Sequence, residues 1–398
     1  MENVLVAGAG MAGLQTVLGL RDLGYTGPIT LLGAEEHRPY DRPPLSKEVL
    51  AGKTDDTSFD VDWAALDVSL LLGRTATALR PGDGGGRVET AEGEIAFDRL
   101  VIATGARAIG LPGAGDVHGV HVLRTIDDAR ALRTELVPGA HVVIVGAGWI
   151  GAEVATAAAA AGCRTTVVEA LDAPLAGALP AEVGARFTPW YAEAGVELLL
   201  GARVDRLEPG AVHLTDGTRL PADAIVVGIG VRPDTAWLAG SGVGLDERGA
   251  VIVDSRLRTS VPGVYAVGDC TVFASARYGT RLHVEHWDNA LRAPRALAAH
   301  LLGGDEAYDP VPYFWSEQFG RMVQYVGHHP AGDELVLRGP GPDGKWTAGW
   351  FAGDTLVALL AVARPRDLAQ GRRLVQAGTA VDKAGFADID VPVKDTAR

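Results

Sequence analysis

Two glycine-rich turns constrain the fold more than any other feature of this chain. They read "GAGMAG" at residues 8–13 and "GAGWIG" at residues 146–151. Each turn follows a short apolar strand pattern and precedes a helical pattern and a second apolar strand, so each marks a β-α-β unit. The two turns start 138 positions apart, at Gly8 and Gly146, which indicates a duplicated domain and not a short repeat. The sequence therefore predicts an α/β fold with two Rossmann-like dinucleotide-binding domains.

The glycines of both turns stand where dinucleotide binding requires them. In each turn the first glycine allows a tight bend, the second lets the backbone approach a pyrophosphate, and the third lets the helix pack on the strand. These glycines are Gly8, Gly10 and Gly13 in the first turn and Gly146, Gly148 and Gly151 in the second. We expect Ile150 in the second turn, and Gly230 in the later segment "GIGVRPD", to bind the second dinucleotide.

Acidic residues follow both units at the distance expected for a ribose contact. Glu35 and Glu36 lie 22 and 23 positions after Gly13, and Glu169 ends the second strand of the later unit. A carboxylate at that place accepts hydrogen bonds from a free ribose 2′-hydroxyl and repels a 2′-phosphate. The segment after Glu169, "ALDAPLAG", contains no arginine. The sequence therefore predicts NADH in preference to NADPH.

Two dinucleotide sites in one chain favour hydride transfer between two different cofactors. Two copies of the same cofactor would leave the hydride without an acceptor. We therefore predict that the chain binds a nicotinamide dinucleotide and a flavin, NADH and FAD, and that the protein positions the two rings for transfer.

Composition and charge exclude other classes. The formal net charge of −14 argues against a nucleic-acid partner, because binding phosphates requires clustered cations. The longest apolar runs are well short of the roughly 20 residues that a bilayer span needs, and the N-terminus shows no signal-peptide pattern. We expect no membrane segment and a cytoplasmic location.

The two cysteines separate this chain from disulfide reductases. Such enzymes need a cysteine against the flavin near the start of the FAD domain, whereas the chain has none before Cys163. The other, Cys270, directly follows Asp269. Reduction of a disulfide substrate and peroxidase chemistry are therefore not expected, and no metal pattern can be built from two distant cysteines.

A set of motifs resembles the FAD-dependent NADH:ferredoxin reductases of oxygenase systems. In chain order they are "GAGMAG", "RPYDRPPLSK", "LVIATGA", "GAGWIGAE", "GIGVRPD", "VYAVGDC", "VEHWDNA" and "YFWSEQ". The resemblance runs from about residue 3 to residue 380. It implies a glutathione-reductase-like fold in which NADH reduces FAD, and FAD reduces an iron–sulfur ferredoxin that serves a haem-thiolate or Rieske oxygenase.

The resemblance also implies a division of the chain. The FAD-binding domain takes residues 1–108 and 236–305, the NAD-binding domain residues 109–235, and a C-terminal α+β domain residues 306–398. Independently of the resemblance, the Gly/Pro-rich crossing 106–115 indicates a boundary. From about residue 306, alternating aromatic and β-branched residues predict an antiparallel sheet followed by a helix over 365–377.

Individual roles carry over from the resembling family to matching positions. Ala12 and Glu35 would contact FAD on its pyrophosphate side and its adenosine ribose, although the family often has its acid one position earlier, where this chain has Ala34. The backbone of Ala76 would hold the adenine. The other implied FAD contacts are Arg124, Asp269 at the ribityl chain and Trp287, whose backbone would face the pyrimidine end of the flavin.

Lys47 is the residue whose interpretation the resemblance changes most. A lysine after a proline turn is ordinarily solvated, but the matching lysine of the family lies near flavin N5 and pairs with a glutamate, here Glu153. A cation there stabilises negative charge on the flavin. The prolines of "RPYDRPPLSK" fix φ and direct Lys47 with little remaining flexibility. Trp315 matches an aromatic near the flavin edge that shapes the route to ferredoxin, and a plain core aromatic is the alternative.

The sequence leaves two questions undecided: which surface binds the partner, and whether an alternative function applies. Ferredoxins are commonly acidic, so an acidic reductase needs a local basic patch. The densest cationic group is Arg364, Arg366, Arg372 and Arg373, with an ordinary solvated helix face as the alternative. We expect a monomer or weak dimer. The rival function is an NADH-binding redox-signalling flavoprotein resembling apoptosis-inducing factor, which shares the fold and the lysine–glutamate pair.

Overall fold

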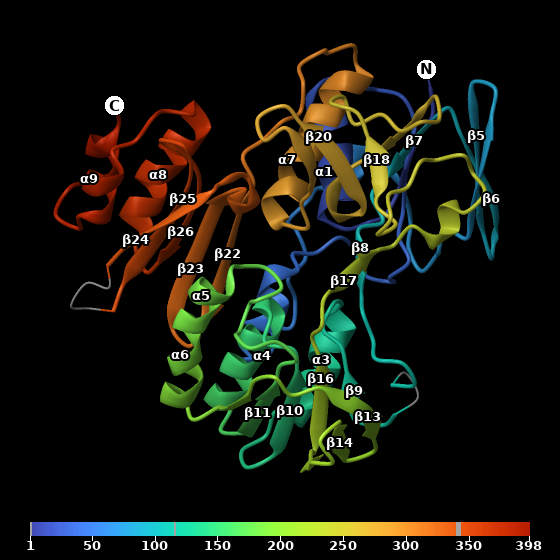
Figure 1. Cartoon of the computed structure of the whole chain (residues 1–398). Helices are drawn as coiled ribbons and strands as arrows, with labels where there is room; N and C mark the ends of the chain where they lie inside the picture. The colour runs from blue at the N-terminus through green and yellow to red at the C-terminus, as the bar shows by residue number, and fades with distance from the viewer. Residues whose placement is uncertain (1, 115–116, 340–343) are drawn as a thin grey trace.

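The first glycine turn lies in a five-stranded parallel sheet. The computed structural model describes residues 2–114, 117–339 and 344–398 (Figure 1). The strand order is β19-β7-β1-β2-β3, and Val4 of the central strand pairs with Ile29 on one side and Arg99 on the other. The bounds are β1 Val4–Ala7, β2 Ile29–Leu32, β3 Ser69–Leu71, β7 Arg99–Ile102 and β19 Val264–Ala266.

Continuous apolar runs explain why these strands form the centre of the molecule. All four residues of β1 are buried, as expected for a parallel strand that is covered on both faces. Helix α1, Met11–Asp22, packs against α7, Trp287–Leu301, and both contribute to the core of this unit. Segments from the beginning and the later part of the chain thus share one core.

The second glycine turn lies in another five-stranded parallel sheet, with the order β12-β11-β10-β16-β9. The alanine-rich helix α4, Trp149–Ala160, follows the turn. Helix α3, Ile126–Glu135, begins with a capping box formed by Thr125 and Asp128. The strands are β9 Val120–His121, β10 His141–Val145, β11 Arg164–Val168, β12 Glu197–Leu199 and β16 Ala224–Val227.

The two connections between the sheets pair with each other. Strand β8, Ala106–Ala108, runs antiparallel to β17, Val231–Pro233, with Arg107 opposite Arg232. The chain therefore leaves and re-enters the first unit side by side, close to the predicted crossing 106–115. Gly115, the last residue of that crossing, lies outside the described residues. The domain limits themselves stay a prediction.

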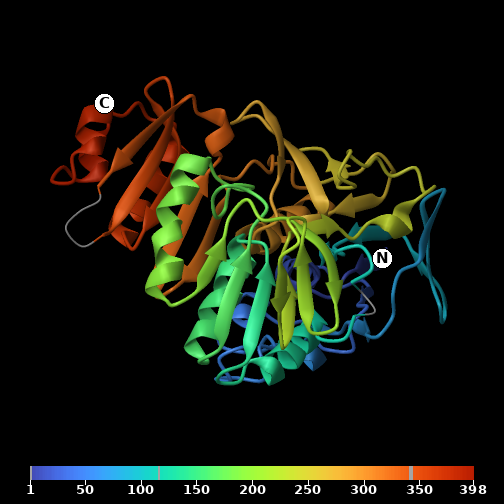
Figure 2. The same ribbon diagram turned by 60° about the horizontal axis from the view of Figure 1, so that its bottom comes forward.

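The C-terminal part forms an antiparallel sheet with the order β22-β23-β26-β25-β24. Figure 2 shows it beside the second parallel sheet. The predicted helix at 365–377 is α8, Pro365–Ala377, which ends at Gly378 with φ 63°, a left-handed conformation that glycine adopts readily. The remaining bounds are β22 Tyr313–Gln318, β23 Arg321–Gly327, β24 Glu334–Arg338, β25 Trp346–Ala352, β26 Thr355–Val362 and α9 Lys383–Ala387.

Smaller elements complete the fold, and the predicted fold class is confirmed. Three small sheets are formed by β4 Ala78–Gly82, β5 Gly85–Thr90 and β6 Gly93–Phe97; by β13 Val204–Glu208, β14 Ala211–Leu214 and β15 Arg219–Pro221; and by β18 Val251–Val253, β20 Thr271–Ser275 and β21 Thr280–His283. Short helices are α2 Trp63–Leu66, α5 Ala181–Gly184 and α6 Thr188–Glu193. Within the described ranges, no helix has the length and apolar character needed to cross a membrane.

Candidate functional site

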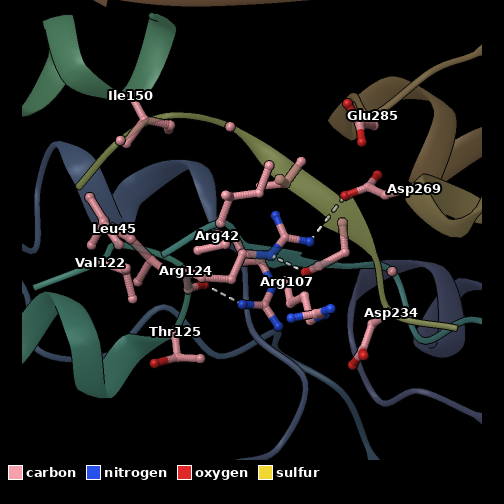
Figure 3. A pocket seen from close by; sticks show the side chains of 18 of the residues that line it. Arg42, Leu45, Arg107, Val122, Arg124, Thr125, Ile150, Asp234, Asp269 and Glu285 are labelled. Carbon is pink, nitrogen blue, oxygen red and sulfur yellow. Dashed lines mark hydrogen bonds and ion pairs between the residues drawn. The ribbon is translucent and has the colours of Figure 1, made fainter. Parts of the chain in front are cut away.

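A continuous cavity of about 1700 Å³ joins the two glycine turns. Its walls come from both turns, from the segment 40–47, from the segment 103–109 and from the start of β22. Figure 3 shows Arg42, Arg107 and Arg124 gathered in this cavity, with Asp269 and Glu285 at one end. The predicted cofactor-site residues line it, except Gly13, Gly151 and Glu36, the second of the two acids that follow the first unit.

The third glycines of the two turns lie outside the cavity wall because they pack against backbone, and the second glycines leave room for a dinucleotide. A Cβ added to Gly13 would lie 1.8 Å from the Gly8 carbonyl oxygen, and one on Gly151 would lie 2.0 Å from that of Gly146. The third glycines therefore serve packing. By contrast, a Cβ on Gly10 would meet no described atom within 4 Å, and one on Gly148 would meet nothing closer than 3.9 Å. Both second glycines border open space at a helix N-terminus, the kind of place at which proteins hold a pyrophosphate, and the pyrophosphate contacts of these glycines stay a prediction.

Glu35 is held at the cavity wall by two neighbours from the "RPYDRPPLSK" segment. Its carboxylate accepts hydrogen bonds from the Tyr40 hydroxyl at 2.5 Å and from Arg42 Nη2 at 2.7 Å. Burial raises the pKa of Tyr40, so its hydroxyl stays a donor. Ala34 is exposed and also lines the cavity. The ribose contact of Glu35 stays a prediction.

Glu169 joins the second glycine turn to the loop after β11. Its carboxylate accepts the backbone N–H of Ala147 at 2.7 Å and that of Leu171 at 2.9 Å. A carboxylate has about four acceptor positions, so capacity remains for ribose hydroxyls. The backbone N–H of Ala202 donates a hydrogen bond of 2.9 Å to the backbone carbonyl of Glu169. The next residue, the exposed Arg203, therefore lies near Glu169 and also lines the cavity. The sequence segment directly after Glu169 gave no sign of this cation.

Arg124, between β9 and α3, forms an ion pair with Asp269 of the first unit. Arg124 Nη2 lies 3.0 Å from Asp269 Oδ2, and Arg124 Nε donates to the Ala106 carbonyl at 2.8 Å. Arg42, which sequence analysis did not select, donates to the Arg124 carbonyl (Figure 3). Its sequence signal was its place among the cations of "RPYDRPPLSK". The two guanidinium groups bring N–H donors to this part of the cavity, and each lies beside a carboxylate, Glu35 for Arg42 and Asp269 for Arg124.

Lys47 and Glu153 form the predicted ion pair, with Nζ 2.7 Å from Oε2. Both side chains line the cavity, and they are 16% and 5% exposed respectively. Lys47 is reached through a short 3₁₀ turn, Pro43–Ser46, so the two prolines do form part of a defined turn. Sequence analysis missed two further partners of Glu153, namely Ser46 and Ser316.

Two tryptophans meet where the first unit faces the C-terminal sheet. Trp287 and Trp315 line the cavity and pack edge to face, with ring centroids 5.6 Å apart. Asp41 accepts a hydrogen bond of 2.7 Å from Trp287 Nε1, while burial raises the pKa of this carboxyl group. Trp315 also stacks on Tyr313 at 6.1 Å. The aromatic chain thus leads from the cavity along β22.

His286 and Glu285 sit beside these rings. The His286 ring lies 4.5 Å from that of Phe314, and burial lowers the pKa of His286 to about 4. Burial also raises the pKa of Glu285, whose carboxylate lies 3.6 Å from His283 Nε2. At neutral pH, His286 is therefore an uncharged member of the wall.

The cysteines stand apart from this chemistry. Among the described residues that line the cavity, neither Cys163 nor Cys270 occurs. Burial raises the pKa of the Cys270 thiol to about 12, so it is not a nucleophile at neutral pH. Within the described part of the chain, no group of three or more His, Cys, Asp or Glu residues is arranged to hold a metal ion.

Comparisons with known proteins agree with the fold. Residues 2–293 match the model of the pyridine nucleotide-disulphide oxidoreductase family, and residues 313–397 match a reductase C-terminal domain. The chain is 37% identical to the 5,5'-dehydrodivanillate O-demethylase ferredoxin reductase subunit of Sphingobium sp., covering 99% of this chain and 98% of the relative.

Two further proteins extend the comparison. The anthranilate 1,2-dioxygenase system ferredoxin–NAD(+) reductase component of Burkholderia cepacia is 36% identical, with 99% of this chain and 98% of the relative covered. A crystal structure of the covalent putidaredoxin reductase–putidaredoxin complex superposes with a TM-score of 0.93 at 32% identity, covering 99% of this chain and 98% of that one.

Proposed function

Because the chain belongs to the pyridine nucleotide-disulphide oxidoreductase family and carries a reductase C-terminal domain, we propose that it is an NADH:ferredoxin reductase. It takes a hydride from NADH onto FAD and passes electrons to an iron–sulfur ferredoxin that serves an oxygenase. The family resemblance predicted from the motifs is confirmed by these matches. The missing cavity cysteine separates the chain from the disulfide-reducing branch that the family name mentions.

The observation that carries the proposal is the cavity that joins the two glycine turns. A volume of about 1700 Å³ exceeds the roughly 300–1,000 Å³ of an ordinary ligand pocket, as two dinucleotides require. Gly10 and Gly148 border it from opposite units, so each pyrophosphate has its own helix N-terminus. The reacting ends of the two cofactors then meet between the units.

The residues of the first unit support binding of FAD. Arg42 supplies a guanidinium group to this site, Arg124 reaches it from the segment between β9 and α3, and Asp269 offers acceptors for the hydroxyls of a ribityl chain. Ala12 and Ala76 line the cavity through small side chains that leave room for the cofactor. Trp287 closes the far end against Trp315.

The residues of the second unit support binding of NADH. Glu169 and Ile150 line the cavity around the second glycine turn, and Gly230, directly before β17, has φ 114°, a conformation that favours glycine. When bound, the flavin supplies the redox chemistry, since it accepts a hydride and releases single electrons. Lys47 places a positive charge at the meeting point, and Glu153 limits the cost of burying that charge.

The route to the ferredoxin starts at Trp315. Its ring lines the cavity, stacks on Tyr313, and Tyr313 in turn lies under the guanidinium of Arg372 at 4.9 Å. The cationic helix α8 is thus two aromatic rings away from the cavity. An acidic ferredoxin that docks on α8 would bring its cluster close to the flavin edge.

The decisive experiment is an NADH-driven assay of the purified yellow holoprotein against a panel of iron–sulfur ferredoxins, repeated with NADPH. Rapid ferredoxin reduction with NADH is expected. A long-lived NADH–flavin complex with negligible turnover of every ferredoxin would instead favour the redox-signalling alternative. Equal efficiency with NADPH would show that Arg203 outweighs Glu169 at the ribose.

A further inference from the structure

Glu153 is a buried junction between three parts of the chain. It lies on α4 of the second unit, and its two carboxylate oxygens face different elements. Oε2 accepts Lys47 Nζ and the Ser46 hydroxyl from the proline turn. Oε1 accepts the Ser316 hydroxyl at 2.6 Å and the Glu317 backbone N–H at 3.3 Å, both from β22.

The ammonium group of Lys47 has all three of its donors engaged within the protein. Besides Glu153, it donates to the Pro43 carbonyl at 3.1 Å and to Ser46 Oγ at 3.3 Å. To contact a flavin, Lys47 must therefore weaken one of these bonds. The strength with which Glu153 holds Lys47 decides how much positive charge the flavin receives.

The Ser316 hydroxyl is oriented toward Glu153 by a neighbour. Gln318 Nε2 donates to Ser316 Oγ at 3.2 Å, so the serine proton is directed to Glu153. Ser316 and Gln318 are both buried, with exposures of 1% and 0%. Since water does not compete at this place, the hydrogen bond to the carboxylate is a strong one.

We propose that Ser316 is a positioning residue. Its hydrogen bond from β22 stabilises the negative charge of Glu153, so that Glu153 holds Lys47 less tightly and Lys47 can move toward the flavin. With Ser316 present, Glu153 keeps three neutral donors when Lys47 moves away. Without it, Oε1 retains a single long backbone hydrogen bond, and the carboxylate holds Lys47 more tightly. The residue acts through Glu153 and Lys47 and does not itself touch the cofactor.

The test compares Ser316→Ala, Ser316→Thr, Glu153→Gln and the double variant Ser316→Ala/Glu153→Gln as FAD-loaded proteins. The flavin midpoint potential is measured by spectroelectrochemistry, and hydride transfer from NADH by anaerobic stopped flow. Ser316→Ala should lower the potential and slow hydride transfer at least about tenfold, the effect of losing one hydrogen bond to a charged group. Ser316→Thr keeps the hydroxyl and should restore both values.

The double variant separates this role from a merely structural one. Once Glu153 is neutral, the proposal expects Ser316→Ala to have no further effect on the potential. Ser275→Ala is a matched control, because Ser275 is also buried and donates to a carboxylate, Asp309, at 2.5 Å, but lies in β20. It should leave the potential unchanged.

The proposal is overturned if Ser316→Ala has the wild-type potential and rate, or if its effect is equally large in the Glu153→Gln background. Should Ser316→Ala fail to retain FAD, Ser316→Cys gives the same comparison with a side chain of similar size and a weaker donor. The inference rests on the proposed function for NADH and FAD alone. The potential needs no ferredoxin, so failure to reduce any ferredoxin would refute the proposed partner and leave this test intact.

Discussion

At the scale of residues, the fold must stabilise the buried negative charge of Glu153, which pairs with Lys47. Glu153 is 5% exposed and would be costly to keep ionised without donors. The structure supplies one cation and three neutral donors from two elements that are distant in sequence. Removing the cation leaves the carboxylate partly satisfied, so a defined loss and not a collapse is expected.

Lys47→Met should lower the free energy of unfolding by about 3 kcal/mol, because a buried carboxylate loses its cation. Hydride transfer from NADH should slow by at least about tenfold, since the charge facing the flavin is lost. Denaturant unfolding and stopped-flow reduction measure the two effects. Lys53→Met is the control, because Lys53 is an exposed lysine that follows the same turn. Equal results for the two variants would contradict the role of Lys47.

His286 makes stability depend on pH in a known direction. Burial lowers its pKa to about 4, while an unfolded histidine titrates near 6.5. Between these values the unfolded chain binds a proton that the folded protein does not, so stability falls as the pH drops from about 6.5 to 4.

His286→Asn removes this difference in proton binding. The loss of unfolding free energy between pH 7 and pH 4.5 should shrink by about 2–3 kcal/mol relative to wild type, as measured by denaturant unfolding. His286→Phe should show the same reduced pH dependence even if its stability at pH 7 differs. An unchanged slope in both variants would mean that His286 is protonated in the folded protein.

The site shows which residues a sequence can reveal. Gly10, Gly148 and Glu169 follow from fixed spacing within one β-α-β unit, and all three line the cavity. Lys47 emerged through the family resemblance and not from composition. Arg42, Ser46 and Ser316 were missed because ordinary polar residues acquire a role only when the fold brings together segments more than 80 positions apart, as in the bond between Ser316 and Glu153.

At the scale of elements, the two glycine turns separate packing from ligand binding. The third glycine of each turn packs against the carbonyl oxygen of the first glycine, whereas the second glycine faces the cavity. The same substitution should therefore have opposite consequences at neighbouring positions of the second turn.

Gly148→Ala should fold normally and retain FAD, but raise the KM for NADH at least about tenfold, because the methyl group occupies the space of the pyrophosphate. Gly151→Ala should instead lower thermal stability strongly, since its Cβ would lie 2.0 Å from the Gly146 carbonyl oxygen. Thermal unfolding and steady-state kinetics distinguish the two. Normal NADH affinity in Gly148→Ala would argue against a pyrophosphate at this turn.

Element types were predictable where a local pattern sets them. Apolar runs gave β1 and β10, and the helix predicted at 365–377 is α8. The pairing of β8 with β17 was not predictable, because its strands are three residues long and more than 120 positions apart. Strand pairing of this kind depends on where the surrounding sheets place the chain.

At the scale of the whole molecule, a net charge of −14 must be reconciled with the acidic ferredoxin that we propose as the partner. Long-range repulsion would slow association unless a local patch of opposite sign faces the ferredoxin. Helix α8 offers such a patch, with Arg366 and Arg373 exposed and Arg372 stacked on Tyr313. Figure 1 shows α8 on the opposite side of the molecule from β5 and β6.

Reversing the two exposed charges, as Arg366→Glu/Arg373→Glu, should raise the KM for the ferredoxin about tenfold or more at low ionic strength, because both charges lie on α8, the helix whose Arg372 lies over Tyr313. The NADH-dependent reduction of a small dye should stay at the wild-type rate, since the cofactor cavity is untouched. Raising the salt concentration should shrink the difference between variant and wild type by screening. The matched control, Arg80→Glu/Arg87→Glu, makes the same change in net charge on β4 and β5, far from α8. If both double variants weaken ferredoxin turnover equally, net charge governs association and α8 is not the docking surface.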